Sequence, residues 1–233
     1  MFLLIKKIIA AAASFAAFIL FTVLVKKVDV GTDEATGRDI GFFKLNIGFH
    51  KLTGFSEGWY KLTQILGIVI IACGLVFAVI GVIELIKRKD LRKVDAQIYA
   101  LGGLYVILGI LYIVFDKIVA INYRPVIMDG ETAPEASFPS SHTMLAIVVM
   151  AGVMIMLNYY IRDRRLRISL QAICALLALL TVVGRLISGV HWFTDIIGSI
   201  LISAFLVSMF MIALDILERR GLIRVNAGKD DLP

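Results

Sequence analysis

The sequence predicts an all-α protein, a polytopic bundle of six transmembrane helices that forms a single membrane domain over residues 1–233. Two observations predict this fold. Sixty per cent of the 233 residues are hydrophobic and 18% are charged, whereas soluble domains are about 45–50% apolar and about 25% charged. Six apolar runs, each close to the roughly 20 residues that cross a bilayer, use about half the chain. No room is left for a large soluble domain.

The apolar runs define the predicted spans, in order: 8–25, 64–86, 96–115, 143–161, 168–187 and 193–216. Lysine pairs flank the first run, which lacks the small-residue cleavage site of a signal peptide. We therefore expect this run to be a retained anchor. Cys73 and Cys174 lie inside apolar runs without metal-ligand spacing, and we expect them to be reduced packing residues.

Lysine and arginine are distributed unevenly between the two sides of this topology. Fifteen of the 24 fall on the side of the chain termini, with tight clusters in the short loops 87–93 and 162–167. The positive-inside rule then places the N- and C-termini in the cytoplasm. The net charge of +6 reflects this topology and attraction to anionic lipid. Because the basic residues are spread over four juxtamembrane segments, we expect no nucleic-acid partner.

The segment 26–62 is predicted to lie at the outer interface. Trp59 and Tyr60 are ring types that favour the headgroup layer. Apolar residues recur at helical spacing before them, at Phe42, Leu45, Phe49 and Leu52. Gly41 and Gly48 weaken a helix, so a loop with a few apolar anchors is an equal alternative.

Polar residues converge at the outer ends of the last four spans. They are Lys117, Arg124, Ser140, Ser141, His142, Arg185, His191 and Asp195. Taken singly, each has a structural explanation: a lysine snorkels, a serine caps a helix, and a histidine and a carboxylate four residues apart stabilise a helix. Charged groups in spans cost roughly 2.5–3.5 kcal/mol and tend to be functional. Their joint position at one membrane level therefore predicts an anion site.

The spacing of these residues resembles the three motifs of the type 2 phosphatidic acid phosphatase family. The motifs are Lys117-(six residues)-Arg124-Pro125, Pro139-Ser140-Ser141-His142 and Arg185-(five residues)-His191-(three residues)-Asp195. They occur in the family's order, so residues 117–195 are the expected catalytic core. Two positions depart from the family pattern: Ser141 stands where glycine is usual, and Gly184 stands where serine is usual.

The resemblance implies a metal-independent phosphatase without a cofactor. His191 would attack phosphorus to form a phosphohistidine, and Asp195 would accept the other imidazole N–H and fix the tautomer. His142 would protonate the leaving oxygen and then activate water. The expected phosphate ligands are Lys117, Arg124, Arg185, Ser140 and Ser141.

The sequence predicts structural rather than catalytic roles for the other polar residues. Asp116, Glu131 and Glu135 are expected to serve the hydrogen bonding of their own loop. His50, the third histidine, is expected at a surface or interface position.

The expected partners are the bilayer and a membrane lipid substrate, with the site facing the extracytoplasmic side of the cell membrane. Undecaprenyl diphosphate is the first choice, and phosphatidylglycerol phosphate and phosphatidate are the alternatives. A lipid phosphotransferase would share the same site. A non-catalytic phospholipid transporter is disfavoured because its charges would lie near the bilayer midplane, and six spans argue against a soluble vanadate-dependent haloperoxidase. The sequence does not indicate the oligomeric state.

Overall fold

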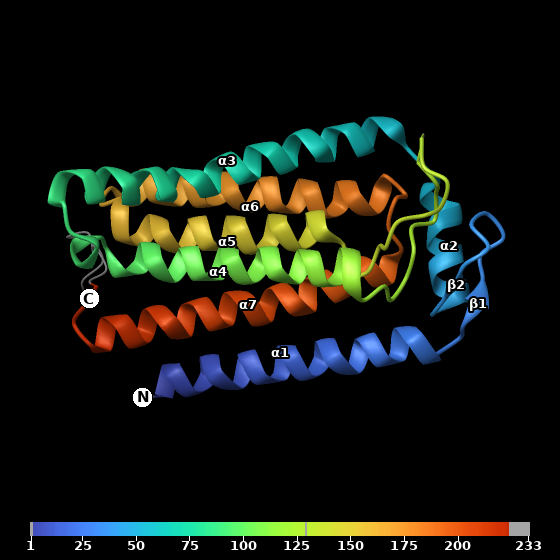
Figure 1. Cartoon of the computed structure of the whole chain (residues 1–233), viewed down its shortest axis with the longest axis horizontal. Helices are drawn as coiled ribbons and strands as arrows, with labels where there is room; N and C mark the ends of the chain where they lie inside the picture. The colour runs from blue at the N-terminus through green and yellow to red at the C-terminus, as the bar shows by residue number, and fades with distance from the viewer. Residues whose placement is uncertain (1, 129, 224–233) are drawn as a thin grey trace.

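The computed structural model describes residues 2–128 and 130–223 and confirms the all-α bundle (Figure 1). Within these residues, six helices are long and apolar enough to cross a membrane. They are α1 (Phe2–Lys27), α3 (Glu57–Arg88), α4 (Ala96–Ile113) with its π-helical continuation η2 (Val114–Ile118), α5 (Ser141–Tyr160), α6 (Arg164–Ile187) and α7 (Phe193–Arg219). Each helix contains most of one predicted span. Most of the helices are a few residues longer than the predicted apolar runs, because they continue into the polar flanking residues.

The smaller elements distinguish the two ends of the bundle (Figure 1). Strands β1 (Gly31–Thr32) and β2 (Asp39–Ile40) form an antiparallel hairpin, and helix α2 (Phe43–Thr53) follows it. These elements and the loop 119–140 form what we call the site end. The opposite, basic end holds the start of α1, the end of α7 and the α3–α4 connection with its 3₁₀ turn η1 (Leu91–Lys93).

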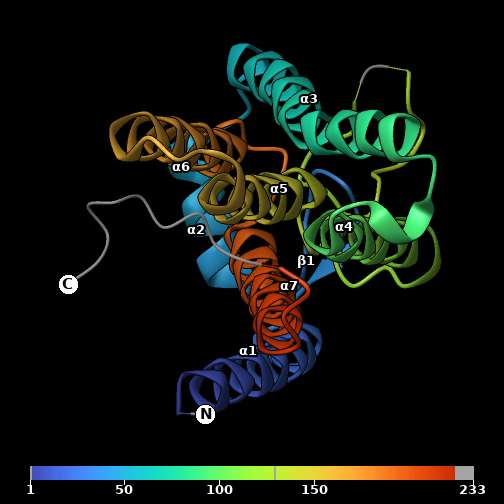
Figure 2. The same cartoon turned by 90° about the vertical axis from the view of Figure 1, so that its left-hand side faces the viewer.

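Helix α5 lies at the centre of the bundle, among α3, α4, α6 and α7 (Figure 2). Its apolar window is the most buried of the six. Helix α1 packs on α7 at the periphery. The central helix begins directly beneath the loops of the site end, so the residues of its first turn face the site.

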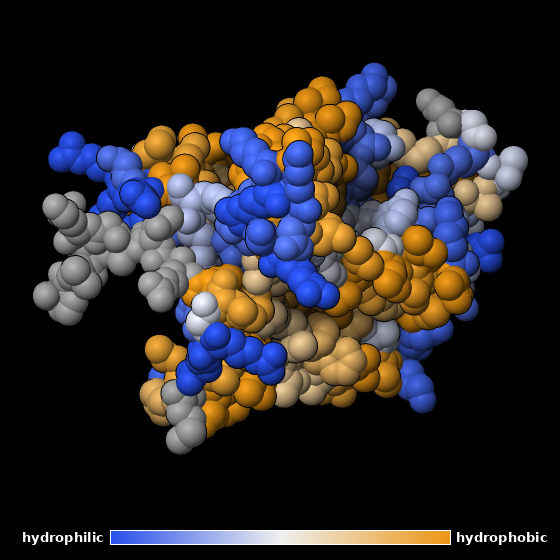
Figure 3. All heavy atoms as spheres, turned by 60° about the vertical axis from the view of Figure 1, so that its left-hand side comes forward, coloured by the Kyte–Doolittle hydropathy of each residue, from blue (hydrophilic) through white to orange (hydrophobic). Residues whose placement is uncertain are grey.

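The flanks of the bundle are hydrophobic. Large apolar side chains are exposed along α1, α3, α4 and α6, where a bilayer would cover them. Figure 3 brings the basic end forward and shows hydrophilic residues gathered there, with hydrophobic surface on the flanks behind it.

Helix α2 lies within the segment 26–62 that is predicted at the interface, and a polar residue anchors it to the bundle. Leu45 and Leu52 are exposed, whereas Asn46 is fully buried. The Asn46 amide donates to the Gly41 carbonyl at 2.8 Å and to Thr194 Oγ1 at 3.0 Å. Its Oδ1 accepts the Thr194 backbone N–H. A polar residue therefore fixes this helix on the first turn of α7.

Candidate active site

Ser140 joins the first turns of α5 and α7. Its hydroxyl accepts the Thr143 backbone N–H at 3.4 Å and thereby caps α5. Its own backbone N–H donates to the Asp195 carbonyl at 3.2 Å, and its carbonyl accepts the Ser199 hydroxyl at 2.9 Å. These bonds hold the second and third motifs against each other.

A glycine turn between α6 and α7 positions His191. Gly189 has φ of 69°, in the left-handed region, and a Cβ there would lie 1.8 Å from the Gly54 carbonyl oxygen. Only glycine meets both requirements. The Ser56 backbone N–H also donates to the Ser188 carbonyl at 3.1 Å. The link between α2 and α3 therefore holds the turn that precedes His191.

A polar cavity of about 300 Å³ lies beneath the loop 119–140 at the site end. His142 and His191 both line it, as the sequence predicts. The predicted residues Lys117, Arg124 and Ser141 are also on its wall. Ser140 is fully buried as the helix cap and lies behind the wall, so its role as a phosphate ligand stays a prediction.

The hydrogen bond of the His191 ring identifies its reactive nitrogen. Nδ1 lies 3.1 Å from the Ser137 carbonyl oxygen. A carbonyl can only accept, so Nδ1 carries the proton and Nε2 carries a lone pair. Nε2 is buried and has no hydrogen-bond partner. This is the protonation pattern that a nucleophilic imidazole needs.

The orienting acceptor differs from the predicted one. Asp195 Oδ2 lies 3.6 Å from His191 Nδ1, which is too long for a hydrogen bond. The carboxylate instead accepts the Trp192 backbone N–H at 3.0 Å and Asn122 Nδ2 at 3.4 Å. The expectation that Asp195 accepts the imidazole N–H is therefore wrong for this structure. The backbone carbonyl of Ser137 is closer to the ring and aligned to accept.

The surroundings of His191 favour its neutral form. Burial lowers the pKa of the His191 imidazole well below its ordinary value of 6.5, and the positive charges of Arg185 and Arg124 lower it further. A neutral ring keeps Nε2 available over a wide range of pH.

Arg185 is a fully buried cation whose donors are largely free. Nη2 donates to Gln64 Oε1 at 3.4 Å, and the guanidinium carbon lies 5.3 Å from the centre of the Tyr60 ring. Nε and Nη1 have no partner. Arg185 is not on the cavity wall, but Gln64 and Tyr60 are. Its free N–H groups and buried charge suit an anion.

The departure at Gly184 has a steric explanation. A Cβ at this position would lie 2.6 Å from Thr63 Cγ2 of α3. The glycine therefore lets α3 approach α6 closely, one residue from Arg185. The same approach brings Gln64 to the Arg185 side chain. A serine here would push against Thr63.

The other two predicted cations are held by acids of the same region. Arg124 Nη2 lies 2.8 Å from Glu135, and Lys117 Nζ lies 2.8 Å from Asp116. The Lys117 side chain is 70% exposed. Asp116 and Glu135 thus pair with predicted phosphate ligands, rather than serving only the hydrogen bonding of the loop. A phosphate would have to compete with them.

Sequence reasoning missed four residues around the site. Tyr60 and Gln64 are polar residues four apart at the start of an apolar span, a pattern that marks one helical face. Asn122 and Ser137 lie in an irregular loop, and Ser137 acts through its backbone carbonyl. No side-chain pattern could have identified that carbonyl.

Comparisons with known proteins concern the fold and the family of this chain. The chain is similar in structure to the first transmembrane PAP2 type phosphatidylglycerolphosphate phosphatase from Bacillus subtilis, with a TM-score of 0.60 and 16% sequence identity over 90% of this chain and 96% of that one. Comparison with curated protein sequences gives no significant match. The model of the PAP2 superfamily matches residues 98–217, which include all three motifs. The chain therefore belongs to the PAP2 superfamily.

Proposed function

We propose that this protein is a lipid phosphate phosphatase that works through a phosphohistidine at His191, with residues 117–195 as its catalytic core. Membership of the PAP2 superfamily supports the reaction class. One observation carries the mechanism. The unprotonated and unpartnered Nε2 of His191 belongs to a ring that shares one cavity with His142, next to the free donors of Arg185.

The reaction follows from these positions. His191 Nε2 attacks phosphorus, and the bond between phosphorus and the lipid oxygen breaks. His142 gives a proton to the departing oxygen and then takes one from water, which attacks the phosphohistidine and releases phosphate. Arg124, Arg185 and Lys117 stabilise the charge on the non-bridging oxygens. Asp195 holds the first turn of α7 beside the imidazole by accepting the Trp192 backbone N–H.

We propose a membrane lipid as the substrate, because the cavity lies at the end of a bundle with hydrophobic flanks. Undecaprenyl diphosphate is our first choice, and the structural relative makes phosphatidylglycerol phosphate the main alternative. The positive-inside rule supports an extracytoplasmic site. A cysteine at Ala35, in the hairpin of the site end, should react with an impermeant reagent on intact cells, and one at Lys89 should not. The reverse pattern would overturn the orientation.

The decisive experiment measures phosphate release by purified protein from a panel of lipid phosphates and diphosphates. His191→Asn keeps a donor that can reach the Ser137 carbonyl but removes the nucleophile. We expect its turnover to fall by at least about 10⁴-fold, as for other lost nucleophiles.

Lys61→Ala is the matched control. It removes an exposed lysine, paired with Glu57 at the same end of the bundle but absent from the cavity wall, and it should leave turnover unchanged. Turnover of His191→Asn within tenfold of the parent protein would contradict the mechanism.

A further inference from the structure

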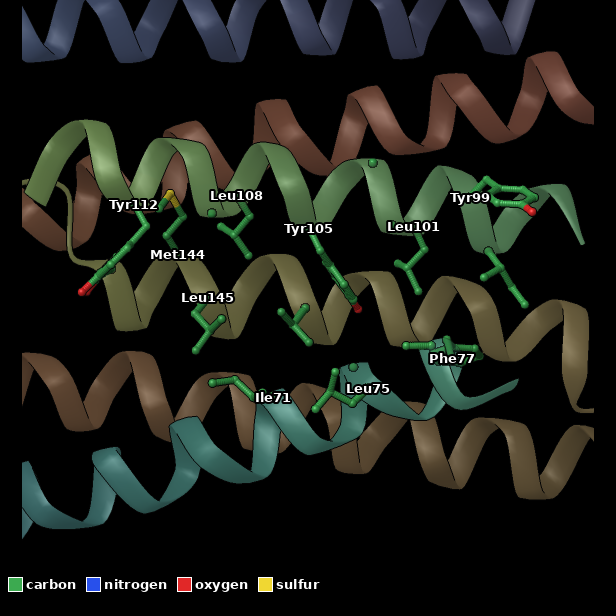
Figure 4. Close-up of a pocket in the computed structure, with 18 of the residues that line it drawn as sticks. Ile71, Leu75, Phe77, Tyr99, Leu101, Tyr105, Leu108, Tyr112, Met144 and Leu145 are labelled. Carbon is green, nitrogen blue, oxygen red and sulfur yellow. The ribbon is translucent and has the colours of Figure 1, made fainter. Parts of the chain in front are cut away.

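An apolar groove of about 790 Å³ runs along the bundle and meets the polar cavity at His142 (Figure 4). Helices α3 and α4 form its sides, and α5 forms its floor. Tyr112, Ser141, His142 and Met144 line both spaces. Helix α3 therefore borders two different spaces along its length, and its polar side chains face only one of them.

The face of α3 that borders the groove becomes polar where the helix reaches the site end. Ile71 lies on the groove wall, whereas Tyr60 and Gln64 lie on the wall of the polar cavity. Between them, a Cβ on Gly67 would lie 3.4 Å from the His142 ring. Positions 60, 64, 67 and 71 have the spacing of one helical face. That face brings Tyr60 and Gln64 to the same cavity as the two histidines.

Gln64 forms hydrogen bonds with both Arg185 and Tyr60, and the chemistry of Arg185 fixes the direction of the amide. Arg185 Nη2 lies 3.4 Å from the amide oxygen Oε1. A guanidinium has donors only, so the oxygen must face it and the amide nitrogen must face away. That nitrogen donates to the Tyr60 hydroxyl oxygen at 3.1 Å. Tyr60 is therefore the acceptor in this contact.

The Tyr60 hydroxyl keeps its proton available for a ligand. A phenol has one proton to donate in addition to its lone pairs, and the bond from Gln64 uses a lone pair. Within the described residues, the hydroxyl makes no other hydrogen bond. The centre of the Tyr60 ring lies 5.3 Å from the guanidinium carbon of Arg185. The free proton is thus close to the free N–H groups of Arg185.

The site needs such a donor because two of the three predicted cations are already paired. Glu135 holds Arg124 and Asp116 holds Lys117, each at 2.8 Å. A phosphoryl group has non-bridging oxygens whose charge must be stabilised in the transition state. A phenol supplies a hydrogen bond without a further positive charge. A further cation would oppose protonation of His142, the proposed acid.

We propose that Tyr60 is a catalytic residue of this site, whose hydroxyl donates a hydrogen bond to a non-bridging oxygen of the phosphoryl group. Gln64 is a positioning residue, because its amide turns the Tyr60 proton toward the cavity while it accepts from Arg185. The inference rests on the proposed function and adds a neutral donor to the cationic phosphate ligands. Placement in the headgroup layer, which the sequence predicts for Tyr60, requires neither the contact with Gln64 nor a position on the cavity wall.

The test compares Tyr60→Phe with the parent protein, because phenylalanine keeps the ring over Arg185 and removes only the hydroxyl. We expect kcat/KM for a lipid phosphate to fall about 10–10²-fold, the range for one hydrogen bond to a charged oxygen. Orthovanadate adopts the pentavalent geometry of the transition state, so its inhibition constant should rise by a similar factor. The inhibition constant does not depend on the fraction of folded protein, so a loss of folding could not mimic this result.

Tyr99→Phe is the matched control. It removes a phenol that donates to the Leu91 carbonyl at 2.6 Å at the basic end. This variant should keep both kcat/KM and the inhibition constant of vanadate within twofold of the parent protein.

A double-mutant cycle tests the role of Gln64. Gln64→Glu keeps an acceptor for Arg185 but has no amide N–H, and its carboxylate draws the Tyr60 proton away from the cavity. Tyr60→Phe should therefore change kcat/KM by less than twofold in that background. Equal losses from Tyr60→Phe in both backgrounds would show that Gln64 does not orient the hydroxyl.

Two results would overturn the assignment of Tyr60: a kcat/KM of Tyr60→Phe within twofold of the parent protein, or a loss of kcat/KM without weaker inhibition by vanadate. Failure of the proposed function is a different result, in which the parent protein hydrolyses no lipid phosphate. In that case orthovanadate should still raise the melting temperature of the parent protein more than that of Tyr60→Phe, and an equal rise would overturn the assignment.

Discussion

The two ends of the bundle treat buried charge differently. At the basic end, several buried or part-buried charged side chains have partners. Lys7 lies 2.6 Å from Asp215, Glu84 accepts the Asp95 backbone N–H at 2.9 Å, and Arg167 of α6 donates to the Ile161 carbonyl at 3.2 Å. At the site end of the same helix, Arg185 keeps two N–H groups without partners.

The comparison separates structural charge from charge available to a ligand. A buried polar group without a partner costs about 1–3 kcal/mol, and more when it is charged. Paired groups at the basic end avoid this cost. The site end retains it at both Arg185 and His191, and such local inconsistency is typical of functional sites.

Among the tests of this comparison, the largest effect is expected from the two buried arginines of α6, Arg167 and Arg185. Arg185→Lys removes the forked guanidinium and should lower kcat about 10²–10³-fold, the loss typical of a transition-state donor. Arg167→Lys should lower the melting temperature and leave kcat within twofold. The kcat of each variant is measured from turnover in detergent, and its melting temperature from thermal unfolding in the same detergent. Equal losses of kcat in the two variants would break the comparison between the ends.

An intermediate effect is expected where α3 crosses α6. Gly184→Ser restores the residue usual in the family but forces Thr63 Cγ2 away from a 2.6 Å contact. Overpacking of this kind costs about 1–3 kcal/mol, so the melting temperature should fall, and kcat should fall with it as Gln64 shifts from Arg185. Thr63→Ser removes the clashing methyl group and should restore both in the double variant. If the double variant recovers neither the melting temperature nor kcat, the steric explanation is wrong.

The smallest effect concerns pH. The His191 pKa is lowered in the folded protein, so below pH 6.5 the unfolded chain binds a proton that the folded protein does not. Stability is therefore complete above pH 6.5 and declines as the pH falls toward the lowered pKa, by at most about 1.4 kcal/mol per pH unit. His191→Asn should flatten this part of a melting-temperature profile. Identical profiles of melting temperature against pH for the parent protein and His191→Asn would contradict the lowered pKa of His191.

Much of the fold follows from the sequence, because hydropathy over about 20 residues identifies spans without tertiary information. The six spans are confirmed, as is the phosphatase family that three motifs indicated. The orientation of the termini stays a prediction. The β1–β2 hairpin and the buried face of α2 could not be predicted. The position of α2 depends on Asn46 reaching Thr194, a contact 148 residues away in the sequence.

The site was predictable where side chains carry the chemistry at fixed spacing. His142 and His191 reach one cavity because both lie at the site end of helices that pack against each other, α5 and α7. The acceptor for His191 was not predictable, since the Ser137 carbonyl belongs to a backbone that every residue possesses. Gln64 was within reach of sequence reasoning, four residues from Tyr60 at the start of an apolar span.

The wall that His142 and Ser141 share between the polar cavity and the apolar groove has a consequence for the direction of the proposed reaction. Inorganic phosphate would diffuse from the exposed side, past Lys117, into water. The dephosphorylated alcohol would stay dissolved among acyl chains. Resynthesis would require both products to meet again across a phase boundary, so dilution of phosphate alone would drive the overall conversion forward without any coupled energy source.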